Sequence, residues 1–306
     1  MIIVAENQIA DLIGRPESLD AVEAVFAAMA AKDAYNFPVI REAIGHADAL
    51  YGFKSGFDRK SLALGLKSGG YWPGNETRGL TNHQSTVVLF DADTGQVKAL
   101  VGGNLLTALR TAAASAVSIK YLAPKGAKVL GMIGAGHQSA FQMRAAADVG
   151  DFEKVIGWNY HPEMIGRLTD TAAEIGLPFE QVSLEQLGEE ADVIISITSA
   201  FAASLMSAHV TGPTHIACMG TDTKGKQEVE AALVARARLF TDEVAQSVSI
   251  GECQHAIAEG LISEGDITEI GAVINGTHAG REGNEITLFD GTGVGLQDLA
   301  RSEERR

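Results

Sequence analysis

The stretch KVLGMIGAGHQSAF, residues 128–141, decides the fold of this chain. Its first half is an apolar run typical of a buried strand, and its second half breaks into the turn GAGHQS, residues 134–139, before a helical segment. In such a unit Gly134 permits the tight turn, and Gly136 lets the backbone approach a pyrophosphate at the helix N-terminus. Ser139 stands where the usual pattern has a third glycine. The turn therefore indicates a dinucleotide site, and an ordinary strand–helix turn is the alternative.

Outward from this turn, the second part of the chain alternates short apolar runs with helical segments. The six runs are KVLGMI, KVIGW, PFEQV, ADVIISIT, THIACMG and ARLFT. This alternation is typical of an α/β domain with a parallel sheet covered on both faces. We expect a Rossmann dinucleotide-binding domain with a six-stranded parallel sheet over residues 121–294.

The first part of the chain, residues 1–120, predicts an α+β domain with an antiparallel sheet. Residues 19–35 carry Val22, Val25, Phe26 and Met29 at helical spacing. The segments DALYGFKSG and SLALGLKSG alternate like strands, and STVVLFDADTGQVKALV predicts a hairpin. The alanine-rich segment that follows is expected to form a helix ending near Ala123, because Pro124 comes next. Residues 295–306 are expected to pack back on this domain, with RSEERR as a charged tail.

Composition limits the partners of the protein. The chain has 306 residues, with 24 Lys and Arg against 39 Asp and Glu, a net charge of −15. This charge argues against nucleic acid and against an anionic membrane as partners. Two cysteines without a CxxC motif favour a reduced, cytoplasmic protein. We also expect no signal peptide, no membrane span and, since the eight histidines form no ligand motif, no metal.

The residue after the second strand bears on the cofactor. An acidic residue there favours NAD, and a nearby arginine favours NADP. This chain has Asn159 at that place, in GWNYHPE, with no arginine beside it in the sequence. We therefore expect NAD as the cofactor, and NADP is the alternative.

Three cations stand in apolar or glycine-rich surroundings: Arg41, Lys67 and Arg110. A charge in such surroundings is costly unless it is paired. Structural salt bridges, or an arginine reaching out to solvent, would explain them. The alternative is a binding site for a carboxylate, to which arginine donates two hydrogen bonds and lysine offers a point charge or a proton.

Four blocks of sequence carry a family resemblance: GNLLTALRTAAASAVSIKYLAP, GMIGAGHQSAFQ, THIACMGTDTKGKQEVE and EITLFDGTGVGLQDLA. In this order they resemble the ornithine cyclodeaminase/mu-crystallin family. The resemblance implies an N-terminal substrate and dimerisation domain, a following Rossmann domain and a homodimer. The family includes cyclodeaminases, alanine dehydrogenases, ketimine and iminosuccinate reductases, and hormone-binding mu-crystallin.

The resemblance also implies roles for single residues. Arg41, Lys67 and Arg110 match substrate positions, and Lys67 with Asp222 would be catalytic. The family commonly has serine at Gly291 and threonine at Asn82. The positions expected to contact the cofactor are Asn82, Arg110, Thr111, Gly134, Gly136, His137, Gln138, Asn159, Thr198, Ser199, Met219, Gly220, Thr221, Asp222, Lys226 and Gly291.

The family chemistry is hydride transfer at the carbon that bears an amine or imine. Lys67, with Asp222 opposite, would supply or organise the proton that the imine takes up. Cyclodeaminases resemble one another in a glutamate thirteen residues before the lysine, where this chain has Lys54. Lys54 would repel the ammonium of ornithine and attract a second carboxylate, unless it points to solvent on an edge strand. His83 either lines the site or is a loop or core histidine.

We therefore expect a small anionic imino or amino acid as substrate. The best candidate reaction is NADH-dependent reduction of iminosuccinate to L-aspartate. An ornithine cyclodeaminase, an alanine dehydrogenase or ketimine reductase, and a non-catalytic mu-crystallin-like binding protein remain alternatives.

Overall fold

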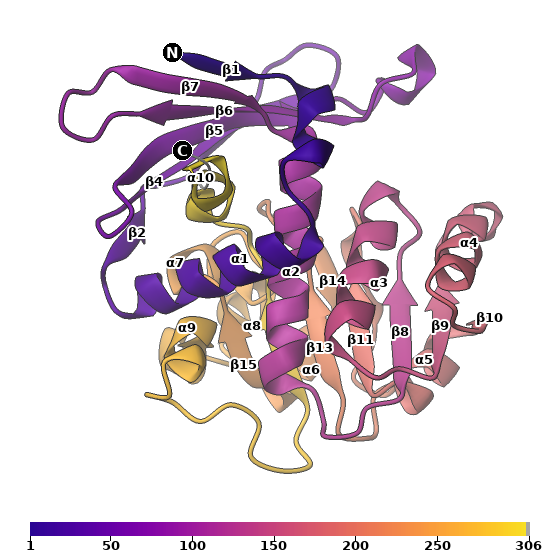
Figure 1. Ribbon diagram of the computed structural model, residues 1–306. Helices are drawn as coiled ribbons and strands as arrows, with labels where there is room; N and C mark the ends of the chain where they lie inside the picture. Colours follow the sequence, from indigo (N-terminus) through magenta and orange to yellow (C-terminus); the bar gives the residue numbers. More distant parts are fainter. Residues whose placement is uncertain (304–306) are drawn as a thin grey trace. The chain divides into compact units, whose positions relative to one another are not determined.

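The computed structural model describes the backbone of residues 1–303 and the side chains of residues 1–300. The chain divides into two compact units (Figure 1): Met1–Arg110 together with the residues from Val294 onward, and Thr111–Gly293. The division falls inside helix α2 (Asn104–Leu122), whereas the predicted boundary at residue 120 lies near the other end of the same helix. The helix ends before Pro124, as its sequence predicts.

The first unit is built on a seven-stranded sheet, in the order β1-β7-β6-β5-β4-β2, with β3 also paired to β4. All pairs are antiparallel except β1 with β7. The predicted strands and the predicted hairpin are confirmed by β4 to β7. The strands are β1 (Ile2–Val4), β2 (Ala34–Asn36), β3 (Ile40–Ala43), β4 (Leu50–Asp58), β5 (Ala63–Tyr71), β6 (His83–Phe90) and β7 (Val97–Gly102).

Helices α1 (Arg15–Ala30) and α10 (Gly295–Glu303) and the first part of α2 complete the first unit, with the short 3-10 turns η1 (Glu6–Asp11) and η2 (Glu76–Arg78). Helix α1 buries the predicted apolar face, including Val25 and Phe26. Helix α10 packs against β4, β5 and α1. The C-terminal segment thus returns to the first unit, although the last three residues of RSEERR lie outside the described residues.

Glycines in the sheet let α10 come close. A Cβ atom at Gly56 would lie 2.9 Å from Leu296 Cγ, and one at Gly65 would lie 2.8 Å from Leu299 Cδ2. Side chains at these positions would therefore push the helix away from β4 and β5.

The opposite face of this sheet is apolar and open. Ile3, Leu100, Val88 and Leu66 lie opposite one another across four neighbouring strands. Ile3 is exposed and the other three are half-buried. On the same face, Phe53 of β4 is 38% exposed. The first unit therefore presents an apolar sheet surface, which we call the open sheet face.

The second unit contains an eight-stranded, all-parallel sheet in the order β10-β9-β8-β11-β13-β17-β15-β16. The predicted parallel α/β sheet is confirmed, but the predicted count of six is wrong because β16 and β17 add to it. The strands are β8 (Val129–Ile133), β9 (Lys154–Trp158), β10 (Phe179–Gln181), β11 (Val193–Ser196), β13 (His215–Cys218), β15 (Arg238–Thr241), β16 (Ile267–Glu269) and β17 (Thr287–Asp290).

Helices and short turns connect these strands, and β12 (Phe201–Leu205) and β14 (Gln227–Val229) form a separate small sheet. The helices are α3 (His137–Val149), α4 (Gly166–Glu174), α5 (Leu184–Glu190), α6 (Ala231–Arg236), α7 (Val244–Ser247), α8 (Gln254–Ala258) and α9 (Ile270–Ile274), with 3-10 turns η3 (Pro162–Met164) and η4 (Glu264–Asp266).

The core of the second unit is apolar, and its strands are buried: Ile133, Ile194, Ile216 and Leu288 have no exposed surface. Because the strands are parallel, their carboxyl ends meet at one edge of the sheet, where α/β proteins bind ligands. The loops that begin at Gly134, Asn159, Ile197, Met219 and Gly291 all leave from this edge.

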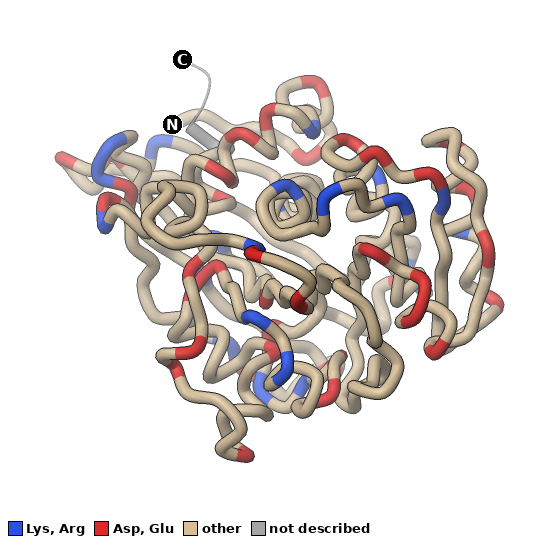
Figure 2. The backbone as a smooth tube through the Cα atoms, turned by 90° about the horizontal axis from the view of Figure 1, so that it is seen from below, with Lys and Arg blue, Asp and Glu red and all other residues tan. Residues whose placement is uncertain are grey.

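The acidic residues and the cysteines follow what the composition predicts. Acidic positions occur along much of the backbone (Figure 2). Cys218 and Cys253 are buried free thiols. Within the described residues, no helix combines the length and apolar character needed to cross a membrane.

Candidate active site

Lys54 and Lys67 lie directly opposite each other on β4 and β5. Both side chains are buried, with residue exposures of 9% and 6%. The alternative in which Lys54 points to solvent on an edge strand is wrong, because β4 lies between β5 and the strands β2 and β3. Like charges directly opposite on a sheet are destabilising. The pair therefore requires negative charge beside it.

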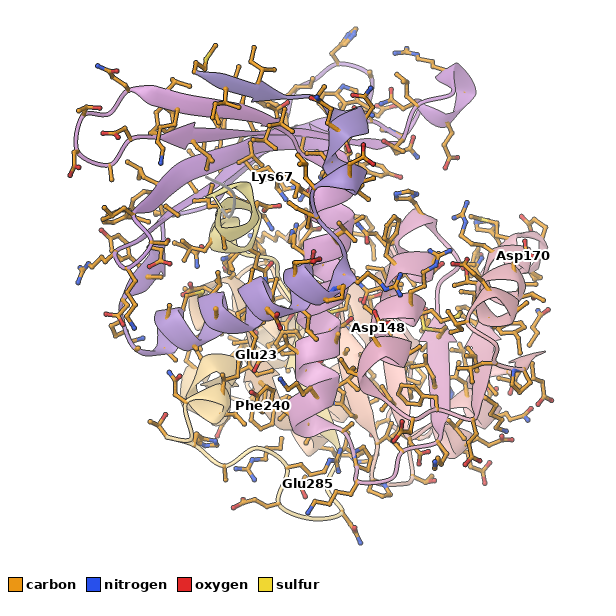
Figure 3. All side chains as sticks on the ribbon, in the orientation of Figure 1. Glu23, Lys67, Asp148, Asp170, Phe240 and Glu285 are labelled. Atoms are coloured by element: carbon orange, nitrogen blue, oxygen red, sulfur yellow. The ribbon has the colours of Figure 1, made fainter. Side chains whose placement is uncertain are left out.

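Asp298 supplies part of that charge from α10. Its carboxylate is fully buried and lies 3.0 Å from Lys67 Nζ through Oδ2 and 3.2 Å from Arg110 Nε through Oδ1. Arg110 Nη1 also donates to Gln297 Oε1 at 3.1 Å, and Lys67 Nζ donates to Thr107 Oγ1 at 3.3 Å. Figure 3 labels Lys67, which lies on the side of the sheet that α10 covers.

The sequence prediction missed Asp298, Gln297 and Thr107. Asp298 carries a signal that would have found it: a charge inside the apolar segment GLQDLA. Arg110 stands out in its own segment by the same criterion.

The surroundings of Lys67 shift its proton equilibrium. Burial, followed by the charge of Arg110, lowers the pKa of Lys67 to about 7, although Asp298 opposes the shift. Burial alone would raise the pKa of Asp298, but Arg110 and Lys67 hold it below its ordinary value. A lysine with a pKa near neutrality can both give and take a proton at physiological pH.

Arg41 and His83 belong to the same face of the sheet. Arg41 lies opposite Gly52, two residues before Lys54 on β4. His83 begins β6, four residues before Val87, which lies opposite Lys67. Burial and the charges of Lys67 and Arg110 lower the pKa of His83 to about 3, so its ring is neutral.

The side chains Arg41, Lys54, Lys67 and Arg110, which we call the cationic cluster, therefore share one region of the first unit. Asp298 pairs with two of them, Lys67 and Arg110. Such a cluster suits an anionic substrate with more than one carboxylate.

Asn82, the remaining predicted cofactor residue of the first unit, precedes β6. Its Oδ1 accepts from Glu76 N at 3.2 Å and its Nδ2 donates to Tyr71 Oη at 3.4 Å. Thr111 follows Arg110 on α2 and is buried.

The glycine turn in the second unit fits a dinucleotide pyrophosphate. Gly134 has φ 103°, and a Cβ atom there would lie 2.6 Å from Ile197 O. Gly136 precedes α3, no side chain caps the helix, and a Cβ atom at Gly136 would meet nothing within 4 Å. Gln138 Oε1 is buried without a hydrogen-bond partner. The backbone N–H groups at this end can therefore receive phosphate oxygens.

His137, the first residue of α3, is half-buried. Burial, followed by the charge of Arg167, lowers the pKa of its ring. His137 is therefore neutral at physiological pH beside the glycine turn.

Asn159 braces that turn, because its Oδ1 accepts from Ala135 N at 2.9 Å. Arg167 Nη1 donates to Ala135 O, also at 2.9 Å. An arginine therefore does stand near Asn159, contrary to the expectation from neighbouring residues in the sequence. It comes from α4, eight residues further along, where sequence adjacency does not reveal it.

The loops after β11 and β13 are tied together by Glu228, a buried residue that the sequence prediction missed. One carboxylate oxygen accepts from Ser196 Oγ at 2.7 Å and from Thr198 N at 2.7 Å, and the other accepts from Gly220 N at 2.8 Å. Ser199 is exposed. Glu228 therefore fixes the backbone beside three predicted cofactor positions, Thr198, Ser199 and Gly220.

A second buried acid, Glu252, supports the same region. It accepts from Thr221 Oγ1, and from Val229 N at 2.8 Å. Burial, followed by the charge of Glu228, raises the pKa of Glu252 to about 8. Glu252 therefore holds a proton at neutral pH.

Asp222 lies in the loop after β13, and its Oδ1 is 2.9 Å from Lys226 Nζ. Lys226 also donates to Gly220 O at 3.0 Å. Within the second unit the structure thus pairs Asp222 with Lys226, while within the first unit it pairs Lys67 with Asp298.

Met219 explains the glycine at position 291. A Cβ atom at Gly291 would lie 2.6 Å from Met219 Sδ. The methionine side chain therefore occupies the space that a serine at position 291 would need.

Comparisons with known proteins place nearly the whole chain in one family. The sequence model of the ornithine cyclodeaminase/mu-crystallin family matches residues 12–303. The iminosuccinate reductase of Paracoccus denitrificans is 73% identical over 300 residues, which cover 98% of this chain and 94% of that protein. Its crystal structure with NAD+ superposes with a TM-score of 0.95, covering 99% of this chain and 94% of that chain.

Two more distant structures share the fold. The Δ1-pyrroline-2-carboxylate reductase of Thermococcus litoralis, in complex with NADH and L-proline, has 27% identity and a TM-score of 0.93, covering 99% of this chain and 95% of that chain. An archaeal alanine dehydrogenase dimer with bound NAD has 29% identity and a TM-score of 0.92, covering 99% of this chain and 94% of that chain.

Proposed function

The chain belongs to the ornithine cyclodeaminase/mu-crystallin family and is an NAD-dependent reductase of an imino acid, and we propose that it reduces iminosuccinate to L-aspartate. Support for the substrate comes from the 73% identical relative, which is an iminosuccinate reductase. Residues of this chain support it independently.

The observation that carries the proposal is the buried pair Lys54 and Lys67. The four side chains of the cationic cluster offer hydrogen-bond donors and positive charge for more than one carboxylate. A dicarboxylate offers two anionic groups to the cluster, and the ammonium of ornithine would be repelled by Lys54.

The chemistry assigned to the chain's residues is as follows. NADH supplies a hydride when it is bound. The Lys67 ammonium gives a proton to the imine nitrogen, and the guanidinium groups of Arg41 and Arg110 hold carboxylate oxygens. The imine carbon gains the hydride and the nitrogen gains the proton, so iminosuccinate, NADH and one proton give aspartate and NAD+. Lys67 then takes a proton from solvent.

The second unit holds the cofactor in this proposal. The glycine turn and the start of α3 receive the pyrophosphate, with Gln138 and His137 beside it. Asn159 stands at the ribose position, and the loops fixed by Glu228 line the nicotinamide. Asp222 and Lys226 act in the same region.

The test is hydride transfer itself. NADH oxidation, followed at its absorbance maximum with oxaloacetate and ammonia as the source of imine, is expected to yield aspartate. Pyruvate with ammonia serves as the monocarboxylate control and is expected to react much more slowly. Proline formation from ornithine without net NADH change, and no aspartate, would instead identify a cyclodeaminase. Cofactor binding without turnover of any of these substrates would identify a binding protein.

We also propose a cytoplasmic homodimer formed through the open sheet face. Its exposed apolar side chains and the dimeric alanine dehydrogenase of the same fold support the dimer. Phe53→Asp is expected to give a monomer in light scattering after size exclusion. Leu261→Asp changes another exposed apolar residue, in the second unit, and should leave the mass unchanged. A monomeric wild type would contradict the proposal.

A further inference from the structure

Asp298 is a buried carboxylate that the reaction above does not use. It is fully buried on α10, and its contacts go to Lys67 and Arg110, two residues assigned to the substrate. A buried charge of this kind is costly unless it is paired and hydrogen-bonded.

We propose that Asp298 is the positioning residue of Lys67: its carboxylate holds the Lys67 ammonium in one orientation and favours the protonated form. The inference rests on the proposed role of Lys67 as proton donor. It adds which residue orients that donor and favours its protonated form.

The geometry places Asp298 for this task. Lys67 Nζ lies within 3.2 Å of Oδ1 and 3.0 Å of Oδ2, so the ammonium faces both carboxylate oxygens. The hydroxyl of Thr107 accepts a further hydrogen bond from the same nitrogen. An ammonium has three donors, so two of them are directed at fixed partners and one remains for the substrate.

Helix α10 gives the carboxylate little freedom to move. It packs closely on β4 and β5 because Gly56 and Gly65 have no side chains. Asp298 also lies in the first turn of α10, where the helix dipole favours a negative charge. Rigid placement of this kind fixes the orientation of Lys67 before the substrate arrives.

The other charged groups around Lys67 act against its proton. Arg110 on α2 and Lys54 on β4 both disfavour the ammonium, and burial disfavours it most. His83 on β6 is neutral, and Arg41 on β3 adds positive charge to the same face. Asp298 is the carboxylate that offsets them, so its loss would leave Lys67 deprotonated at neutral pH.

The experiment measures the protonation of Lys67 directly. The whole protein is labelled with acetic anhydride at a series of pH values, and mass spectrometry follows acetylation of the peptide containing Lys67. The midpoint of the wild type is expected near pH 7. In Asp298→Asn, which keeps the side-chain shape, the midpoint should move to lower pH by about 1 to 3 units.

Two further variants make the outcome decisive. Arg110→Gln removes a positive charge that disfavours the Lys67 ammonium. The midpoint of Lys67 acetylation should therefore move to higher pH. Asp170→Asn removes an exposed carboxylate on α4 (Figure 3) and should leave the midpoint unchanged.

An unchanged midpoint in Asp298→Asn would overturn the inference, as would an equal shift in Asp170→Asn. If Asp298→Asn does not fold, Asp298→Ser decides, and a midpoint that stays or rises overturns the inference. Because labelling needs no turnover, the result stands even if iminosuccinate proves not to be the substrate.

Discussion

Lys67 is the proton donor of the proposed reaction, and two opposing influences act on its pKa. Burial and Arg110 lower its pKa, while Asp298 retains the proton. A proton donor with a pKa near the working pH is an efficient one.

Lys67→Met tests this role. The variant keeps most of the volume but has no proton to give, so kcat for imine reduction should fall by about 10² to 10⁴-fold. Stopped-flow or steady-state NADH oxidation measures the fall, and NADH fluorescence titration should give an affinity within about twofold of the wild type, since Lys67 belongs to the other unit. A weaker NADH affinity with an unchanged kcat would contradict the assignment.

Lys54→Glu tests the second carboxylate. Replacing the cation by an anion beside Lys67 should raise KM for the dicarboxylic imine by roughly 10-fold or more, the loss expected for one charged hydrogen bond. The ratio of kcat/KM between the imines of oxaloacetate and pyruvate measures the change.

Lys125→Glu is the matched control, because it makes the same charge change at an exposed position. It should leave that ratio unchanged. If both variants behave alike, the net charge of the protein and not Lys54 determines the preference.

At the residue scale, the sequence predicts cations better than acids. Arg41, Lys67 and Arg110 are visible because each interrupts apolar or glycine-rich sequence. Glu228 and Glu252 are not, because no periodic apolar run surrounds either residue, and only the fold buries them under the loops.

At the scale of the element, the turn into α3 separates two demands on glycine. Gly134 has a positive φ and a crowded Cβ position, whereas Gly136 has an ordinary φ of −71° and open space around it. Gly134 is thus required by the fold, and Gly136 leaves open space where we propose that the pyrophosphate binds.

Alanine substitutions should show the difference. Gly134→Ala should lower the free energy of unfolding by about 1 to 3 kcal/mol. Gly136→Ala should leave that free energy unchanged within about 0.5 kcal/mol and weaken NADH binding, since its methyl group occupies space that the pyrophosphate needs. Urea unfolding and NADH titration of the two variants measure both quantities. Tight NADH binding by Gly136→Ala would show that the turn does not hold the pyrophosphate.

Element prediction from the sequence succeeded where runs are long. The helices ending at Ala30 and Leu122 and the strands β4 to β7 follow their periodicity. Strand β16 has three residues, too few for a periodic signal, and β17 is fully buried in a glycine-rich block that shows no alternation.

At the scale of the whole molecule, buried acids of the second unit make stability depend on pH. Burial raises the pKa of Glu252 from 4.5 to about 8 and that of Asp290 from 3.8 to about 7. The folded state therefore holds protons that the unfolded chain has lost. Between about pH 4.5 and pH 8, each rise in pH therefore lowers the free energy of unfolding. The stabilising contribution of the bound protons is lost once the pH has risen through the pKa values of the folded state.

Glu252→Gln should weaken this dependence, because glutamine stays neutral throughout. The fall in melting temperature between pH 5 and pH 8 should be at least about 2 °C smaller than in the wild type. Differential scanning calorimetry of the apoprotein measures it, with Glu189→Gln, an exposed change, as the control. Parallel curves for wild type and Glu252→Gln would show that Glu252 is ionised in the folded state at neutral pH.

The return of the chain through α10 to its first unit has a consequence for biosynthesis. The second unit is continuous from Thr111 to Gly293, so it is complete in sequence before α10 leaves the ribosome. The sheet that bears Lys67 is translated before the second unit, yet its lysine meets Asp298 only once α10 has been translated. A nascent chain arrested before Val294 would thus carry a complete second unit and a first unit that lacks α10.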